Sequence, residues 1–207
     1  MAGQETDRQT RIGFRKVVQT ELKAITAVAS DAQSKSSELD LSGLWGVSIF
    51  IDHARDAAAA FVGAGTEYRV EVSQKYTGND TWRTIASVVC DITAAVTITT
   101  SNLEAIGSTL IECGAVVPTV GDIVFFKNAS LDLSEWAKVI TVVPATSFTI
   151  LDGLTNAQAA SNYFNKAEVF VLNIYTDNFV RLRVVCNNNN GATNQNIIWR
   201  CAAITED

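Results

Sequence analysis

Apolar and polar side chains alternate along several segments of the chain from residue 38 onward. In EYRVEVSQ, Tyr68, Val70 and Val72 share one face, and charged side chains occupy the other. This is the pattern of a β-strand with one buried face. Further strands are expected over residues 38–42, 47–52, 82–92, 167–175, 179–186 and 197–205. The sequence therefore predicts a mainly β protein.

Two turn sequences separate these strands. Gly78-Asn79-Asp80 lies between the strands at 67–74 and 82–92, and Asn187 to Asn190 followed by Gly191 lies between the last two. Asparagine and glycine tolerate positive φ, so both segments are typical of hairpin turns rather than of sites.

Residues 101–160 differ from the rest of the chain in the length and spacing of the expected strands. Short strand sequences follow one another closely there, namely TLIEC, VGDIVFFKN, EWAKVITVV and SFTILDGL. Turn residues separate them, as in Asn128-Ala129-Ser130 and Pro144-Ala145-Thr146. Short, closely spaced strands are typical of small barrels, so we expect a compact module of SH3-like or OB-like size.

The N-terminal region shows a different apolar spacing. Phe14, Val18, Leu22, Ile25 and Ala29 follow one another at intervals of three or four residues, which predicts a helix over residues 14–24. The sequence ITAVAS within this region also fits a short strand. Residues 1–11 are polar, and we expect them to become ordered on a partner.

Together these patterns predict an antiparallel β-sandwich, jelly-roll-like, with an inserted small β-barrel and a short N-terminal helix or arm. Residues 1–37 would form the arm and possible helix. Residues 38–100 and 161–207 would form the sandwich, and residues 101–160 the barrel.

Composition narrows the function classes. The chain has 207 residues, of which 47% are hydrophobic and 18% charged, as expected of a globular protein. The formal net charge of −6 argues against a free-standing nucleic-acid binder. The N-terminus has no signal-peptide core, and no apolar stretch approaches the roughly 18 residues of a membrane helix. We expect a protein made in the cytoplasm, without export or a membrane anchor.

The four cysteines do not suggest a metal or redox site. Cys90, Cys113, Cys186 and Cys201 contain no C-x-x-C pair, and three of them lie in apolar runs. We therefore expect buried thiols.

One polar cluster could carry acid–base chemistry, Asp52-His53-Ala54-Arg55-Asp56, which contains the only histidine of the chain. It follows a predicted strand, where catalytic loops often lie. No Gly-x-Ser-x-Gly elbow accompanies it, and no nucleophile can be assigned. The simpler interpretation is a polar loop.

Three other groups of residues are weaker candidates. The acidic side chains at Asp122, Asp132, Glu135 and Asp152 lack the spacing of a calcium loop. Residues 63–66, GAGT, precede a strand rather than the helix that a phosphate loop needs. A basic face could combine Arg69, Arg83, Arg181 and Arg183, although ion pairing across strands is the simpler explanation.

The four tryptophans are scattered over the strand regions, at Trp45, Trp82, Trp136 and Trp199. They could form a sugar-binding platform or belong to the core of a β protein. These two interpretations remain open from the sequence.

Three segments resemble small structural proteins of tailed bacteriophages: residues 36–52 (SSELDLSGLWGVSIFID), 135–158 (EWAKVITVVPATSFTILDGLTNAQ) and 181–207 (RLRVVCNNNNGATNQNIIWRCAAITED). The resemblance lies in strand texture and covers most of the chain after about residue 36. It implies a non-enzymatic part of the virion, which coats the capsid or builds the neck or tail.

The first functional hypothesis is accordingly a capsid decoration or cement protein, with no enzymatic activity, catalytic residue, cofactor or metal. Its partners would be the major capsid protein or other virion proteins, as a homo-oligomer or lattice-bound subunit, with no membrane and no specific nucleic acid. It would reside in the virion after assembly in the host cytoplasm. The alternatives are a neck or tail protein, a carbohydrate-binding sandwich with Trp82 or Trp136 exposed, and an enzyme built around His53.

Overall fold

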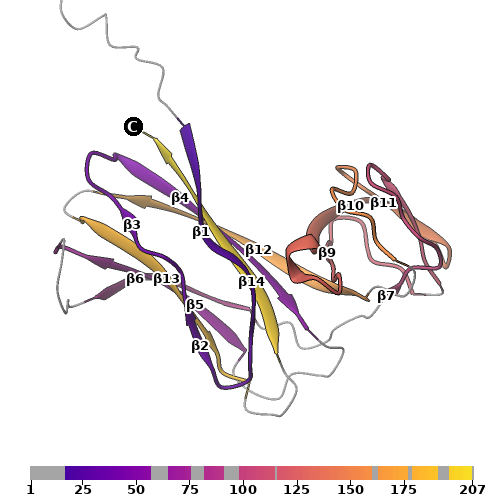
Figure 1. Cartoon of the computed structure of the whole chain (residues 1–207), viewed down its shortest axis with the longest axis horizontal. Coiled ribbons are helices and arrows are strands. Elements are labelled where there is room, and N and C mark those ends of the chain that lie inside the picture. The colour runs from indigo at the N-terminus through magenta and orange to yellow at the C-terminus, as the bar shows by residue number, and fades with distance from the viewer. Residues whose placement is uncertain are drawn as a thin grey trace, which may run out of the picture.

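The structure is a computed structural model that describes residues 17–56, 65–75, 82–90, 98–114, 116–159, 163–176, 179–190 and 196–206. Figure 1 shows two facing sheets and a second β unit that extends from one end of them. The described residues contain no helix long and apolar enough to cross a membrane.

The facing sheets form a sandwich. The strands of its first sheet are, in spatial order, β1 (Val17–Val28), β14 (Ile197–Glu206), β4 (Gly46–Arg55) and β12 (Tyr163–Tyr175). In the second sheet, β13 (Arg181–Asn188) lies between β5 (Thr66–Ser73) and the short strands β2 (Gln33–Lys35) and β3 (Leu39–Asp40), and β6 (Arg83–Cys90) follows β5. All of these strand pairs are antiparallel.

The connectivity of the sandwich is that of a jelly roll. Because β2 and β3 both pair with β13, they take the place of one interrupted strand. The sandwich then has eight strands, and the pairs β1–β14, β2–β13, β4–β12 and β5–β6 join the first to the last, the second to the seventh, and so on inward. The pairs β14–β4 and β13–β5 complete the two sheets. A long antiparallel ribbon wound in this way gives two packed Greek keys.

A small barrel is inserted between β6 and β12. Its remaining elements are β7 (Ile98–Thr99), β8 (Leu110–Glu112), β9 (Ile123–Phe126), β10 (Glu135–Val143), β11 (Ser147–Ile150) and the 3-10 turn η1 (Leu131–Leu133). The strands follow the order β12–β9–β10–β11–β8, and β7 pairs with the other side of β12. A β-bridge between Thr100 and Cys113 joins the β7 and β8 ends, which closes the ring. The predicted fold class is thus confirmed, apart from the helix.

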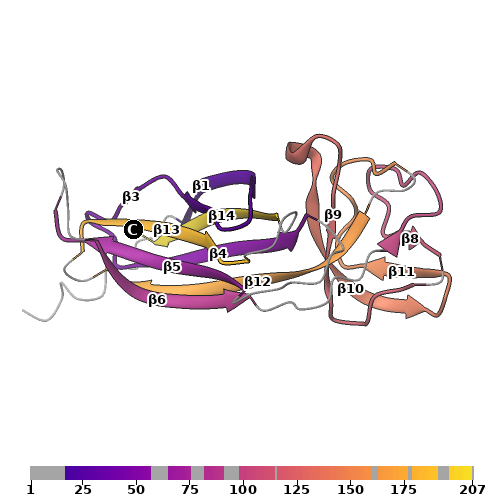
Figure 2. The same cartoon turned by 90° about the horizontal axis from the view of Figure 1, so that it is seen from below.

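The strand β12 connects the two units. Its residues 164–167 pair with β9 of the barrel, and its residues 167–175 pair with β4 of the sandwich. Figure 2 shows this strand running from one unit into the other. A small apolar cluster, which contains Phe125 and Trp136 from the barrel and Ile198 from the sandwich, fills the junction.

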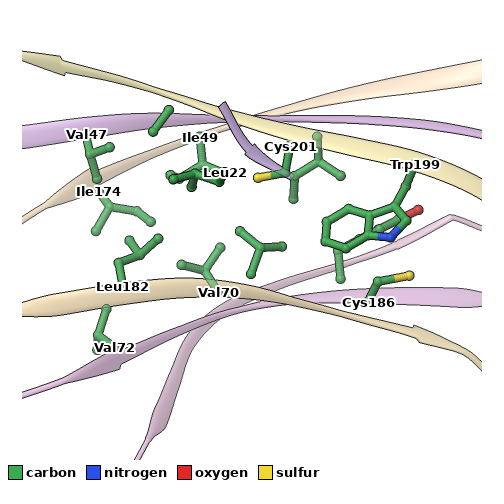
Figure 3. Packing of buried hydrophobic residues seen from close by; sticks show 14 of the residues in the cluster. Leu22, Val47, Ile49, Val70, Val72, Ile174, Leu182, Cys186, Trp199 and Cys201 are labelled. Carbon is green, nitrogen blue, oxygen red and sulfur yellow. The ribbon is translucent and has the colours of Figure 1, made fainter. Parts of the chain in front are cut away.

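The sandwich core is made by the inward positions of the predicted alternation. Val47, Ile49 and Ile51 of β4 are buried against Tyr68, Val70 and Val72 of β5 and against Leu182 and Val184 of β13. Figure 3 shows Val47 and Ile49 on one side of this core and Val70, Val72 and Leu182 on the other. The barrel has a separate core, in which Phe126, Val139 and Phe148 are buried.

The predicted helix over residues 14–24 is wrong for the part that the structure describes, because Val17–Val28 form the strand β1. Its pairing with β14 shifts register between Glu21 and Lys23 and again between Lys23 and Thr26. Leu22 packs in the sandwich core, whereas Ile25 packs in the junction cluster on the outer face. The helix-like spacing therefore reflects apolar residues on both faces of an irregular strand. Strands β1 and β2 therefore place residues before 38 in the sandwich.

The asparagine-rich segment is more than a turn. Asn187 and Asn188 still belong to β13, and Asn188 and Asn190 are buried. The side-chain amide of Asn188 donates to the carbonyl oxygens of Val28 (3.2 Å) and Ala29 (3.0 Å), which ties the end of β1 to β13. Gly191 and the predicted turn at 78–80 lie outside the described residues.

Candidate functional site

His53 lies inside β4 rather than in a loop, because β4 is paired with β12 as far as Ala54 and with β14 as far as Arg55. Its side chain is fully buried between the sheets. Nδ1 shares a hydrogen bond of 2.7 Å with the Tyr68 hydroxyl, and the two rings meet edge to face at 5.7 Å. Burial, with a smaller contribution from the charge of Arg55, lowers the imidazole pKa from 6.5 to about 3. The imidazole is therefore neutral near pH 7.

The strand geometry also divides the polar cluster around His53. Successive side chains of a strand point to opposite faces. Asp52 and Asp56 point away from the interior, where Asp52 pairs with Arg200 and Asp56 with Lys127. The structure does not bring these carboxylates to the imidazole, so the five residues do not form one site.

The acidic residues of the barrel hold local loops. The Asp122 carboxylate accepts a hydrogen bond from the Thr119 amide at 2.9 Å. The Glu135 carboxylate accepts bonds from the amides of Thr155 (2.8 Å) and Asn156 (3.1 Å). Across the described parts of the chain, no group of three or more histidine, cysteine or acidic side chains could hold a metal ion.

The glycine-rich segment 63–66 is described only from Gly65 onward. Gly65 has φ of +81° and directly precedes β5. A Cβ atom here would lie 2.6 Å from the Cys90 carbonyl oxygen. Close approach of two backbones therefore explains this glycine, and no helix N-terminus follows it that could bind a phosphate.

Arg69, Arg181 and Arg183 of the second sheet are paired with carboxylates, as expected. Arg183 lies opposite Glu71 on the neighbouring strand, and their charged groups are 2.7 Å apart. Arg181 pairs with Glu38 at 2.7 Å. The guanidinium groups of Arg183 and Arg181 lie 4.0 and 5.2 Å from the centre of the Trp82 ring. On this face, carboxylates neutralise the arginine charges, and the two guanidinium groups cover the Trp82 ring.

The remaining tryptophans take different roles. Trp199 is buried in the sandwich core. Trp136 is half-buried at the junction, where its Nε1 donates to the His53 carbonyl oxygen at 3.2 Å and Arg200 lies 4.8 Å from its ring. Since arginines lie over both Trp82 and Trp136, neither offers the open ring face expected of a sugar platform.

The most exposed aromatic side chains are instead Trp45 and Tyr175, at 75% and 84%. They are neighbours at one end of the sandwich. Tyr175 pairs with Gly46, the residue after Trp45, and the Thr176 amide donates to the Trp45 carbonyl oxygen at 3.4 Å. No local pattern in the sequence predicts this proximity, because the two residues are 130 positions apart along the chain.

The outer face of the first sheet carries an apolar hollow that the sequence analysis missed. The register places Val171, Phe50 and Ala202 side by side in one row across three strands. Ile204 lies in the next row, opposite Ser48. We call these four apolar residues, Phe50, Val171, Ala202 and Ile204, the apolar groove. An antiparallel sheet usually presents polar residues on its solvent face.

Three hollows follow one another along this face. The first, of about 320 Å³, lies over Phe50, Ala202 and Ile204. The second, of about 290 Å³, shares Ile204 with it and reaches Tyr175. The third, of about 300 Å³, shares Glu21 and Arg200 with the first and reaches the barrel loops at Asp132, Glu135 and Asn156. The face is thus concave from the aromatic end to the junction.

The four cysteines are buried thiols, as expected. Burial raises the pKa of Cys186 and of Cys201 to about 12, since the charged thiolate is disfavoured in an apolar environment. Neither thiol is poised as a nucleophile near pH 7.

No protein-family model matches the chain, and no curated protein matches it significantly in sequence. A solved structure to which it is similar is that of the infectious bursal disease virus VP2 subviral particle, with a TM-score of 0.26 and 7% identity. The match covers 100% of this chain and 45% of the VP2 chain. A TM-score of this size establishes neither a shared fold nor a shared function.

Proposed function

We propose that the chain is a non-enzymatic structural protein of a virion. The observation that carries this proposal is the connectivity of the sandwich, an eight-stranded jelly roll with a closed lobe inserted between its fifth and sixth strands. Jelly rolls build viral capsid domains, and they also occur in lectins and cupins. The argument is an analogy at the level of the fold, so the surfaces of this chain must support it.

Two surface features favour assembly. The first is the concave apolar face of the sandwich described above. The second is the inserted barrel, on which Leu103, Ile106, Val120 and Leu151 are exposed on loops away from the barrel core. Exposed aliphatic side chains on a projecting lobe are suited to contacts with other subunits. Modest contacts become effective when a symmetric shell repeats them many times.

Within the virion, we assign the chain to the outside of the capsid as a decoration or cement protein of a tailed bacteriophage. It would bridge joints between shell subunits and oppose the internal pressure of the DNA. The sandwich would seat on the shell, and the barrel would supply a second contact. A position in the neck or tail is the main alternative, and it requires a head-to-tail ring interface.

A carbohydrate-binding role is the second candidate, favoured by the exposed pair Trp45 and Tyr175. Adjacent exposed aromatic rings can stack on sugar faces. A glycan-binding assay with Trp45→Ala and Tyr175→Ala tests this role. Binding that both substitutions abolish would favour it over the structural role.

The deciding experiment is the copy number of the chain in purified particles from its source, measured by quantitative mass spectrometry against the main shell subunit. A number comparable with that subunit supports decoration. A handful of copies moves the chain to the neck, tail or fibres, and complete absence overturns the virion role. Rebinding of Leu103→Asp to stripped particles, with Ile85→Asp on the sandwich as the matched control, then tests whether the barrel makes the contact.

A further inference from the structure

Within the described residues, the outer face of the first sheet is covered only near the barrel. There, Ala54 and Ile198 of this face are buried against Phe125, with Ile25 and Trp136 packed at the edge of the same cluster. Further along the same strands, the described part of the chain supplies no cover for the apolar groove, and Val171 is 50% exposed. The groove is therefore the open continuation of a surface that already forms an apolar contact.

The charges along this face become negative toward the barrel. The first hollow, over the groove, is lined by the carboxylates of Glu21 and Asp52, and the third, at the barrel end, adds those of Asp132 and Glu135. Two cations, Lys23 and Arg200, lie among them, and Arg200 pairs with Asp52. An occupant with apolar side chains and a net positive charge fits this surface.

Residues 1–16, which precede the described structure, have that character. They contain four basic and two acidic residues, a net charge of +2, which leaves −8 on the rest of the chain because the total is −6. Their end reads Arg11-Ile12-Gly13-Phe14-Arg15. When extended, this segment places Ile12 and Phe14 on one face and the two arginines on the other.

We propose that residues 11–15 of one copy lie extended in the apolar groove of a second copy. Ile12 and Phe14 are two positions apart, as are Ala202 and Ile204 on the floor of the groove, so their spacings along a strand match. The arginines, with their long and flexible side chains, reach the carboxylates at the rim.

The residues at Arg15-Lys16 favour binding of the segment to the groove of a second copy rather than to its own groove. Val17 begins β1 opposite Glu206, at the rim of the sandwich (Figure 1). Phe14 could return to its own groove only by a tight reversal at Arg15-Lys16. The favoured two-residue reversals have positive φ, which suits glycine and asparagine, and neither Arg15 nor Lys16 is one of these. This inference does not rest on the virion role, because it concerns two copies of the chain in solution.

Disulfide trapping between two full-length variants tests the proposal. Phe14→Cys and a size-tagged Ile204→Cys are mixed, oxidised mildly and separated under denaturing, non-reducing conditions. The native thiols are buried, so the introduced ones react. We expect a mixed dimer in at least about tenfold excess over the control pair of Phe14→Cys with Leu103→Cys, whose cysteine lies on the barrel. The excess should fall at high salt, because part of the attraction is electrostatic.

Three outcomes would overturn the proposal. The first is a yield no greater than that of the control pair, provided that Ala202→Cys, a second groove position, behaves in the same way. The second is an internal disulfide without dimer in the double variant Phe14→Cys/Ile204→Cys, which would place the segment on its own copy. The third is a dimer yield unaffected by Arg11→Glu/Arg15→Glu. None of these results bears on particle copy number, so the two proposals can fail separately.

Discussion

The buried imidazole of His53 should make the protein sensitive to mild acid. Its pKa is lowered from 6.5 to about 3 in the folded protein, mainly by burial. Between these two pH values the unfolded chain binds a proton that the folded chain does not. The unfolding free energy therefore rises with pH through this window, and the full contribution is present above pH 6.5. As the pH falls below 6.5, this stability is progressively lost.

The size of the effect follows from the unfolded pKa. One pH unit of differential protonation corresponds to about 1.4 kcal/mol. At pH 5 the unfolded imidazole is protonated and the folded one is not, so the loss relative to pH 7 is about 2 kcal/mol. Such a loss is a large part of the stability of a typical domain.

Urea unfolding at pH 7 and pH 5 measures the effect, with His53→Gln as the comparison. A glutamine amide can still bond to the Tyr68 hydroxyl but does not titrate, so the difference in pH dependence isolates the imidazole. Tyr68→Phe is the matched control, since it removes the hydrogen bond and should retain the pH dependence. Because His53 is the only histidine, its NMR titration is unambiguous. An imidazole that titrates near pH 6.5 in the folded protein would refute the reasoning, as would equal pH dependence in the wild type and His53→Gln.

Three further outcomes are expected. Gly65→Ala should lower the unfolding free energy in a urea titration by more than about 2 kcal/mol, because the site combines positive φ with a backbone clash. Gly43→Ala is the control, since this site has positive φ but open space, and it should lower the unfolding free energy by about 1 kcal/mol. Phe148→Ala should destabilise the barrel by about 3–5 kcal/mol, because Phe148 is buried in the barrel core. Ile106→Ala, at an exposed position, should change the unfolding free energy by no more than about 0.5 kcal/mol. Equal losses of stability in thermal unfolding would contradict this barrel core. A thiol reagent should label none of the four cysteines in the native protein within minutes and all four in denaturant, and a fast-labelling native thiol would argue against their burial.

The sandwich could be predicted wherever one face of a strand is buried and the other is wet. In β5 the inward positions Tyr68, Val70 and Val72 are apolar and two of the positions between them carry the ion-paired Arg69 and Glu71. The alternation of apolar and polar residues along such a strand can then be recognised in the sequence. Of strand β1, the sequence indicated only the ITAVAS part, and as an alternative to a helix, because two register shifts break that period and its pairing with β14 is what defines it as a strand.

The chemistry of the polar cluster at 52–56 could not be read from its composition. A run with an aspartate, a histidine and an arginine looks like a loop when each residue is judged alone. In the fold, β4 is a central strand with neighbours on both sides, so the same residues continue the sheet and are sent alternately inward and outward. The inward imidazole acquires a buried partner, and the outward carboxylate acquires Arg200. Both partners come from other strands, which the local sequence does not specify.

The outer face of the first sheet did leave a trace in the sequence, in β12. The run EVFVLNIY is apolar at Phe170, Leu172 and Ile174, which pack inward, and again at Val169 and Val171, which point outward. A strand that is apolar on both faces belongs between two covering layers. The barrel covers the first part of this strand, up to Ala167, and no layer of the described chain covers Val171. The apolar outer positions of β12 thus indicate that this face is built to be covered, which makes the groove, rather than the buried histidine, the better candidate for a partner site.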